Sequence, residues 1–420
     1  MSTPAPTAAP AGPPVGRLIA VLAAAAGLVG LDSLVVSPLI PEITAHTHTA
    51  LGLGGFMVTV YAAVYAVFGP LFGPVSDRWG RKKTLLTGLV VFLVGTALTG
   101  TGSNFAVLLG FRAVAGLGAA ILMPSVFALV SDSVPPQRRG AAIGLVVGTL
   151  MGTSVIGVPL GAFAANGLSW RVPFFAIAVL ALIELVVVRL VIPSAPPTRQ
   201  IPVGPFTAFR GQFKAAFAEP TVAFVLFSSL LWWAGNQGLF ANTGVFYGGI
   251  YHLSTAEIGW IVLVTGAAGF GGNMLGGRLA DRFGKRPVIA TAAGGAAVTM
   301  VVFSSLTSTL AAAVVVQVVW SLFFGLGQAS LTTLVSELSP KARGTALSLN
   351  GSAQYSGMML GTAIAALILD HGGRFVWIGS VSALFCALIF PIVLWLVRER
   401  RESPAGAAPS PAAQPEPSAH

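Results

Sequence analysis

Three ionisable side chains lie inside long apolar stretches of the chain, where a charge is costly. They are Asp32, Arg112 and Glu184, in the apolar runs 18–38, 105–131 and 172–193. On insertion scales a charged residue at the centre of a membrane helix costs roughly 2.5–3.5 kcal/mol, so a functional role is the first hypothesis for each. A carboxylate and a guanidinium that meet there can form a buried pair, and protonation of the acid would break it.

The predicted depths of Asp32 and Arg112 are consistent with such a pair. At about 1.5 Å per helical residue, Asp32 lies about 21 Å and Arg112 about 19–20 Å from the same membrane face. We therefore predict that they meet, either as a protonation switch or as a static pair that only neutralises charge. Glu184 lies nearer the inner face and is either functional or a protonated or locally paired structural group.

The composition indicates whether these charges lie in a soluble protein or in a membrane protein. Only 9% of the residues are charged, 55% are hydrophobic and the mean hydropathy is +0.84. An ordinary soluble domain carries about 25% charged residues, so this composition excludes a soluble enzyme and a disordered chain and indicates an integral protein of the lipid bilayer. The net charge of +10 does not indicate nucleic acid as a partner, because the basic residues are scattered between apolar runs.

No cofactor or metal is expected from the sequence. His, Cys, Asp and Glu do not occur at metal-ligand spacing, and the single cysteine, Cys386, permits no internal disulfide. The sequence contains no phosphate-binding P-loop, which argues against an ATP-driven pump.

Twelve apolar runs are each long enough to cross a bilayer, which takes roughly 20 helical residues. They cover residues 18–38, 52–74, 84–102, 105–131, 140–165, 172–193, 221–246, 256–279, 288–306, 309–335, 344–370 and 375–397. With the N-terminus inside, all but three of the 23 Lys and Arg residues fall in cytoplasmic segments or at cytoplasmic helix ends. The positive-inside rule therefore predicts a multi-pass protein of the cell (inner or plasma) membrane with both termini cytoplasmic.

Composition also divides the chain into segments. Residues 1–16 and 398–420 are rich in Pro, Ala and Ser and are expected to be disordered cytoplasmic tails. Residues 194–220 are expected to be a cytoplasmic linker between six-helix bundles at 17–193 and 221–397.

The two halves repeat each other at one offset of 204 residues, the difference between 281 and 77. Gly73-Pro-Val-Ser-Asp77-Arg78-Trp-Gly80-Arg81-Lys82 aligns with Gly277-Arg-Leu-Ala-Asp281-Arg282-Phe-Gly284-Lys285-Arg286, and Arg139 aligns with Arg343. Parallel six-span repeats with a site between them at the middle of the bilayer are a transporter architecture.

At these loops the chain resembles the major facilitator superfamily, whose signature G-x-x-x-D-R-x-G-R-K/R is complete from Gly73 and nearly complete from Gly277. The resemblance covers roughly residues 17–397. It implies an all-α membrane protein with twelve transmembrane helices in two pseudo-symmetric six-helix bundles around a central cavity. It also implies alternating access, with runs 1, 4, 7 and 10 nearest the cavity, and we expect a monomer.

The two signature loops are interpreted as gates on the cytosolic side. Their glycines permit close helix approach and a tight reversal, and Asp77 can sit against the positive N-terminal end of a neighbouring helix. The alternative for the basic residues is a purely topological role. The predicted gate residues are Gly73, Asp77, Arg78, Gly80, Arg81, Arg139, Gly277, Asp281, Arg282, Gly284 and Arg343.

Three further patterns resemble those of twelve-span drug:proton antiporters. Asp32, followed by Pro38 and Pro41, resembles the first-span pattern D-x-x-x-x-x-P-x-x-P. The segment that begins at Arg112 resembles the fourth-span motif R-x-x-Q-G-x-G, whose Arg is associated with proton coupling, although Ala115 stands at the Gln position. The resemblance therefore implies proton coupling by Asp32 and Arg112. The fifth run resembles the antiporter motif of that span, and its glycine spacing predicts close helix packing at Gly148, Gly152, Gly157, Pro159 and Gly161.

The predicted cavity lining is aromatic and rich in amides. It consists of Tyr61, Tyr65, Met123, Trp233, Asn236, Gln237, Phe240, Gln354 and Tyr355. Such a lining beside one carboxylate suits small lipophilic or cationic compounds. We therefore predict a secondary transporter and not an enzyme: an antiporter that exports such compounds by proton-coupled efflux, as in drug resistance. The alternatives are proton-coupled export of a specific metabolite, such as a sugar or amino-acid derivative, and proton-coupled import on the same fold.

Overall fold

The fold was analysed in a computed structural model that describes residues 15–193, 220–305, 309–338 and 343–397, with Thr207, Gly211 and Lys214. The predicted tails, 1–16 and 398–420, and the predicted linker, 194–220, fall almost entirely outside these residues. Only Val15 and Gly16, which begin the first helix, and a few linker positions are described.

The first half consists of six long helices. They are α1 (Val15–His46), α2 (Phe56–Trp79), α3 (Arg81–Thr101), α4 (Phe105–Ser133), α5 (Pro136–Gly167) and α6 (Val172–Val191). A short 3-10 helix, η1 (Leu51–Gly55), leads into α2.

The second half has the same plan with one additional short helix. It consists of α8 (Pro220–Phe240), the short α9 (Thr243–Ile250), α10 (Thr255–Phe283), α11 (Lys285–Ser305), α12 (Leu310–Leu338), α13 (Arg343–Asp370) and α14 (Phe375–Pro391), which continues as a π-helical turn, η3 (Ile392–Leu396). Eleven helical segments of the described chain are long and apolar enough to cross a membrane. Together with α5, which spans 32 residues, they make the twelve long helices expected from the sequence.

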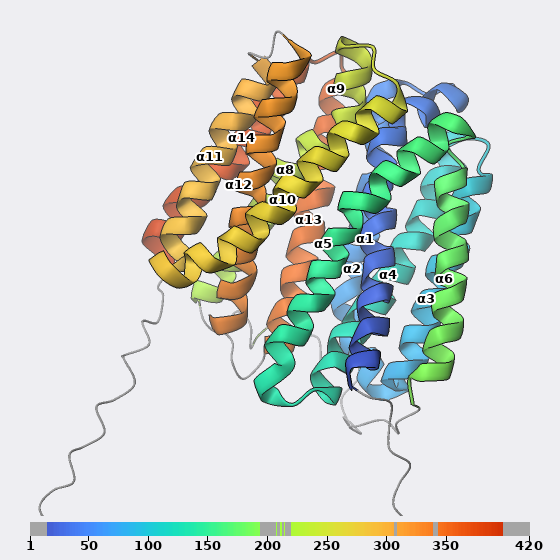
Figure 1. Ribbon diagram of the computed structural model, residues 1–420, viewed down its shortest axis with the longest axis vertical. Helices are drawn as coiled ribbons and strands as arrows, with labels where there is room; N and C mark the ends of the chain where they lie inside the picture. Colours follow the sequence, from blue (N-terminus) through green and yellow to red (C-terminus); the bar gives the residue numbers. More distant parts are fainter. Residues whose placement is uncertain are drawn as a thin grey trace, which may run out of the picture.

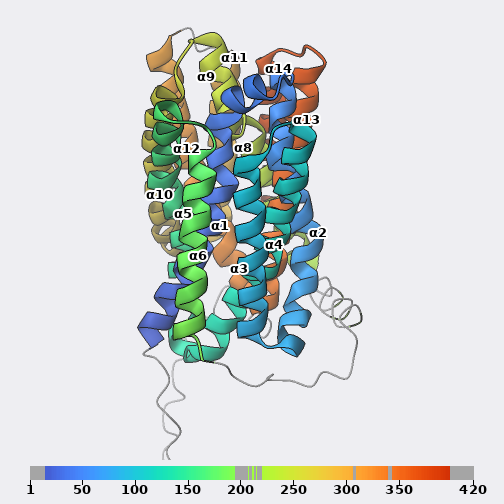
Figure 2. The same ribbon diagram turned by 90° about the vertical axis from the view of Figure 1, so that its right-hand side faces the viewer.

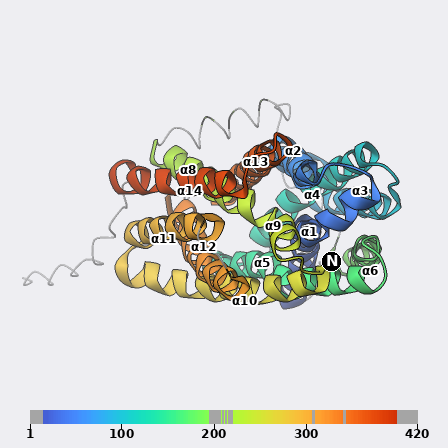
Figure 3. The same ribbon diagram turned by 90° about the horizontal axis from the view of Figure 1, so that it is seen from above.

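The two halves form separate bundles that lie side by side (Figure 1). Seen from above, α3 and α6 lie at the far edge of the first bundle, and α11 and α14 lie at the far edge of the second (Figure 3). Between the bundles, α2 packs against α13 and α5 packs against α10. This arrangement is the predicted pair of six-helix bundles.

Two glycines end equivalent helices of the repeat. Gly80 has φ 93° and Gly284 has φ 89°, values that a residue with a side chain rarely adopts. Because the chain reverses there, α3 begins at Arg81 and α11 at Lys285, directly after α2 and α10. The tight reversal predicted for Gly80 is therefore present, and its repeat partner has the same conformation.

Hydrogen bonds between the two halves cluster at the end of the molecule that carries the C-terminus of α1. The Ser37 hydroxyl donates to the Phe240 carbonyl at 2.7 Å, and the Thr59 and Thr362 hydroxyls lie 2.7 Å apart. Near the same end, Thr255 at the start of α10 donates to the Glu42 carboxylate. Figure 2 shows this end, where α9 lies above α1, at the top of the molecule. The two halves are therefore joined across this end.

Candidate functional site

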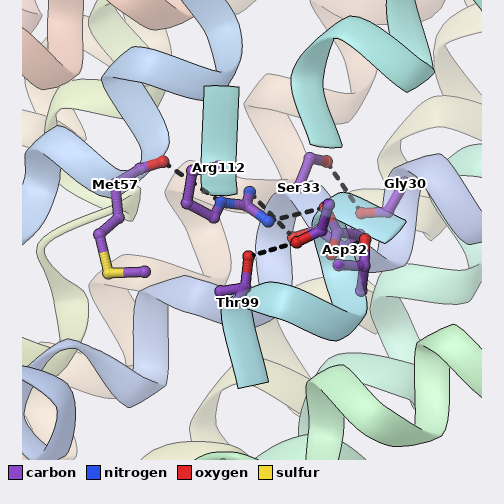
Figure 4. A network of polar contacts seen from close by, with 8 residues as sticks. Gly30, Asp32, Ser33, Met57, Thr99 and Arg112 are labelled. Carbon is purple, nitrogen blue, oxygen red and sulfur yellow. Dashed lines mark hydrogen bonds and ion pairs between the residues drawn. The ribbon is translucent and has the colours of Figure 1, made fainter. Parts of the chain in front are cut away.

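The predicted pair of Asp32 and Arg112 is present between α1 and α4. Arg112 Nη1 lies 2.7 Å from Asp32 Oδ2, and both side chains have no exposed surface. Figure 4 shows the guanidinium facing the carboxylate across the gap between the helices. An N–O distance of this length indicates a charge-assisted hydrogen bond.

The remaining polar atoms of the pair also have partners. Arg112 Nη2 donates to the Asp32 carbonyl at 3.3 Å, and Arg112 Nε donates to the Met57 carbonyl at 3.4 Å. The Thr96 hydroxyl of α3 donates to Asp32 Oδ1 at 3.2 Å. The Arg112 guanidinium lies over the Tyr61 ring, 4.4 Å from its centroid. Four helices thus hold the pair in one geometry, and the contacts of Met57 and Thr96 were not predicted from the sequence.

Two glycines downstream of Arg112 explain how α4 approaches its neighbours closely enough to place the guanidinium. A Cβ atom added at Gly118 would lie 2.2 Å from the backbone nitrogen of Phe92 in α3. One added at Gly116 would lie 2.5 Å from the carbonyl oxygen of Tyr61 in α2. A side chain at either position would push the backbones apart, so the glycines let α4 lie close to α2 and α3, which both contact the ion pair.

A central cavity lies between the halves, next to the ion pair. Of the predicted residues, Tyr65, Met123, Trp233, Gln354 and Tyr355 line it. An adjoining cavity is lined by Trp233, Asn236, Gln237 and Phe240. Leu34, Trp233 and Gln328 line both, so the two cavities are neighbouring parts of one region.

Tyr61 is the predicted lining residue that faces neither cavity. It is fully buried beneath Arg112, and its hydroxyl has no hydrogen-bond partner in the described part of the chain. Tyr65 lies one helical turn further along α2, and its side chain does face the central cavity. The helical spacing placed the two tyrosines on one side of α2, but the Arg112 guanidinium covers only the first of them.

Gln328 is a lining residue that the sequence analysis missed. It lies on α12, and its Oε1 accepts a hydrogen bond from the Trp233 indole at 2.9 Å, while its Nε2 donates to Thr332 at 3.3 Å. An amide inside an apolar run is costly in lipid, and this holds for Gln328 as it does for the predicted lining residues Asn236 and Gln237. That argument, together with the expectation that run 10 faces the cavity, could have identified Gln328.

The loops of the repeat make ion pairs within their own halves. Arg81 Nε lies 3.0 Å from Asp132 at the end of α4, and Lys285 Nζ lies 2.7 Å from Glu337 at the end of α12. Arg81 and Lys285 are equivalent positions, so each half anchors this loop to its own fourth helix. The acidic partners were not predicted.

The structure places the other predicted gate residues in different environments. The side chains of Asp77, Arg139 and Arg343 lie outside the described part of the structure. Arg78 and Asp281 are exposed, and Arg282 lies over the Phe283 ring at 5.2 Å. A Cβ added at Gly73 or Gly277 would meet no atom of the described residues within 4 Å. At the end of α10 the close approach is made instead by the neighbouring Gly276, where an added Cβ would lie 2.6 Å from the Leu326 carbonyl oxygen of α12.

The glycine pattern of α5 makes the predicted close packing at only part of its length. Added Cβ atoms at Gly157 and Gly161 would lie 2.5 Å from Leu31 and 2.7 Å from Val35 of α1. An added Cβ at Gly148 or Gly152 would meet no atom of the described residues within 4 Å, so these two glycines do not make the predicted close packing in this conformation. Pro159 lies inside α5, between the two packed glycines.

Glu184 lies on α6, at the outer edge of the first bundle, but its side chain faces inward. It is only 7% exposed, and its Oε1 has no hydrogen-bond partner among the described residues. Helix α6 packs against α3 and α1. The described residues contain no group of three His, Cys, Asp or Glu side chains that could hold a metal ion.

Comparisons with known proteins place the chain among membrane transporters. The model of the Major Facilitator Superfamily matches residues 22–341 and 243–419. The uncharacterized MFS-type transporter YceJ of Bacillus subtilis (strain 168) is 30% identical over 372 residues, which cover 88% of this chain and 92% of the relative. Multidrug resistance protein 3 of the same organism is 26% identical over 408 residues, which cover 83% of this chain and 78% of the relative.

A solved structure has the same fold. The human organic anion transporter MFSD10 matches with a TM-score of 0.73 at 16% identity, over 91% of this chain and 100% of its own. With two six-helix bundles, a cavity between them and a family model that matches nearly the whole sequence, this chain belongs to the major facilitator superfamily of membrane transporters.

Proposed function

We propose that this protein exports small lipophilic or cationic compounds in exchange for protons, as multidrug-type transporters do. The observation that carries the proposal is the fully buried pair of Asp32 and Arg112, directly behind the cavity wall formed by Ser33 and Leu34. Replacing a buried ion pair by apolar residues is often neutral or stabilising, so packing alone gives little reason to keep one. A carboxyl that gains and loses a proton gives such a reason.

The cavity lining supports the substrate class. The described residues around both parts of the cavity are aromatic, apolar, amide or hydroxyl residues, without a charged side chain. Aromatic faces bind apolar molecules and, through their quadrupoles, organic cations. The similarity to a relative named multidrug resistance protein 3 agrees with this class.

The proposed cycle uses Asp32 as the proton site. With both termini in the cytoplasm, the end joined by Ser37, Thr59 and Thr255 faces outside, and the conformation described here is closed to the outside. In the outward-open state, external protons load Asp32 and weaken its hold on Arg112. After the transition to the inward-open state, Asp32 releases the proton and the cavity takes up substrate, which leaves when the transporter opens outward again.

The driving force is sufficient for export. One proton that moves down a potential of about 100 mV and about one pH unit supplies about 2.3 plus 1.4 kcal/mol. At one proton per substrate, this free energy sustains roughly a 500-fold gradient of a neutral compound.

The remaining features of the proposal concern the whole molecule. We infer a monomer with bundles at 17–193 and 221–397, cytoplasmic tails at 1–16 and 398–420, and a cytoplasmic linker at 194–220. The cytoplasmic location of both termini is supported by the distribution of Lys and Arg along the chain.

Transport in proteoliposomes tests the function. Vesicles with an acidic lumen, and with the membrane potential clamped by valinomycin and equal K⁺, receive labelled tetraphenylphosphonium in the medium. Molecules whose cytoplasmic face points outward should accumulate the cation up to about tenfold per pH unit, at one proton per cation. Asp32→Asn should bind the cation but fail to accumulate it.

A matched control and the opposite gradient separate the alternatives. Asp370→Asn changes an exposed acid at the end of α13 and should transport like the unaltered protein. Accumulation only into vesicles with an alkaline lumen would indicate import. Uphill transport by Asp32→Asn at the normal level would contradict the role of Asp32, and proton-driven transport of a metabolite without tetraphenylphosphonium would favour a specific exporter.

A further inference from the structure

Two tyrosines from opposite halves stack on each other in the wall of the central cavity. The rings of Tyr65 on α2 and Tyr355 on α13 have centroids 3.7 Å apart and planes inclined by 24°. Both residues line the cavity. Stacked aromatic pairs are worth roughly 0.5–1.5 kcal/mol beyond the area they bury, so this contact holds α13 against the first half.

Tyr355 also reaches the ion pair by two routes. Its ring centroid lies 6.3 Å from that of Tyr61, the ring on which the Arg112 guanidinium rests at 4.4 Å. Its hydroxyl also lies near Ser33, the residue next to Asp32, at a range where the two side chains interact. The Ser33 hydroxyl donates to the Gly30 carbonyl at 3.0 Å, so its oxygen is free to accept from the Tyr355 hydroxyl.

Tyr355 therefore belongs to the second half of the chain and lies near a neighbour of each partner of the ion pair: Tyr61 beneath Arg112, and Ser33 next to Asp32. In the described part of the chain, the titratable or charged groups in interaction range of Asp32 are Arg112, Tyr61 and Tyr355. Two of the three belong to the first half. Of these three residues, Tyr355 is the one that lines the cavity and belongs to the second bundle.

We propose that Tyr355 is the positioning residue that couples occupancy of the central cavity to the proton on Asp32. A bound compound packs on the cavity side of the stacked tyrosines and holds Tyr355 where it supports Ser33 and Tyr61. This geometry is the one in which Asp32 and Arg112 are paired. Substrate binding thus favours loss of the proton: the carboxyl O–H bond breaks, its electron pair stays on the Asp32 oxygen, and the proton passes to water.

Linkage makes the effect reciprocal. Protonation of Asp32 separates it from Arg112, disturbs the rings of Tyr61 and Tyr355, and weakens substrate binding by the same factor. Substrate and proton then exclude one another through Tyr355, as an antiporter requires. The inference rests on the proposed proton coupling by Asp32, and it adds the residue that connects the coupling site to the cavity.

The test measures proton release instead of transport. The full-length protein in detergent, in a weakly buffered solution with a pH indicator, is mixed with tetraphenylphosphonium. The unaltered protein should release up to one proton per bound cation, and its dissociation constant should fall as pH rises. Tyr355→Phe keeps the ring but removes the hydroxyl beside Ser33, and the binding difference between pH 6 and pH 8 should shrink three- to tenfold, the equivalent of one hydrogen bond.

Two further variants sharpen the test. Ser33→Ala removes the acceptor without touching the tyrosine and should have the same effect, even if Tyr355→Phe folds poorly. Tyr247→Phe is the matched control, because it removes a buried tyrosine hydroxyl that donates to Gln317 at 2.6 Å outside the cavity lining. This control should leave proton release unchanged.

The outcomes distinguish the two proposals. If the unaltered protein binds no tetraphenylphosphonium, or binds it without releasing a proton, the proposed function fails together with this inference. If it releases protons and Tyr355→Phe and Ser33→Ala release them equally, with the same pH dependence of binding, the proposed function stands and the role of Tyr355 is wrong.

Discussion

Replacing Arg112 by Met removes the cation and leaves the Asp32 carboxylate buried without its partner. The two charge centres lie about 4 Å apart, so their attraction is about 4 kcal/mol at an effective dielectric constant of about 20. The change also leaves the Met57 carbonyl without its donor. Breaking a buried pair by removing one partner costs about 3–5 kcal/mol, and we expect Arg112→Met to lose that much free energy of unfolding.

A double variant tests whether the loss has this origin. Asp32→Leu combined with Arg112→Met removes both charges, and we expect it to recover at least about 2 kcal/mol of the loss, because no unpaired buried charge remains. The assay is unfolding in mixed micelles of increasing dodecyl sulfate content, followed by circular dichroism. A double variant no more stable than Arg112→Met would refute the reasoning, since the loss would then come from packing and not from the orphaned carboxylate.

Three further predictions follow from the packing of the helices. Gly118→Ala should destabilise the protein by about 1–3 kcal/mol in the same assay, because its Cβ would meet the α3 backbone, whereas Gly148→Ala should cost nothing; equal effects would contradict the packing assignment. Gln328→Leu should weaken tetraphenylphosphonium binding about two- to tenfold at equilibrium, since it leaves the Trp233 indole N–H unpaired, and unchanged affinity would exclude this contact from the site. Glu184→Gln should preserve transport and stability within about 0.5 kcal/mol, because Gln keeps the shape and hydrogen-bonding oxygen of a protonated carboxyl; loss of transport with an intact fold would instead give Glu184 a functional role.

Much of the architecture could be predicted from single residues and their spacing. The twelve helices follow from apolar length, because each must satisfy its backbone hydrogen bonds within the bilayer. The pairing of Asp32 with Arg112 follows from the helical rise, which gives both residues the same depth. The reversal at Gly80 follows from a conformation that only glycine adopts readily.

The direction in which a side chain points around its helix depended on the neighbours. Tyr61 and Tyr65 lie on the same side of α2, yet only Tyr65 faces the cavity, because α4 and its arginine cover Tyr61. Glu184 faces into the bundle although its helix lies at the edge. Gly148 and Gly157 share one pattern, but among the described residues only an added Cβ at Gly157 would meet α1.

The sequence by itself determined what each segment must do in lipid: which parts cross, at what depth the charges lie, and where the chain must turn. Hydropathy and helical rise are properties of a residue and its position in the chain, so they can be read without knowing the neighbours. Only the tertiary structure decided which end of the molecule joins the two halves and that Tyr355 lies between the cavity and the ion pair. Those contacts depend on the packing of helices from opposite halves, more than 200 residues apart in the chain, whose mutual rotation no local pattern specifies.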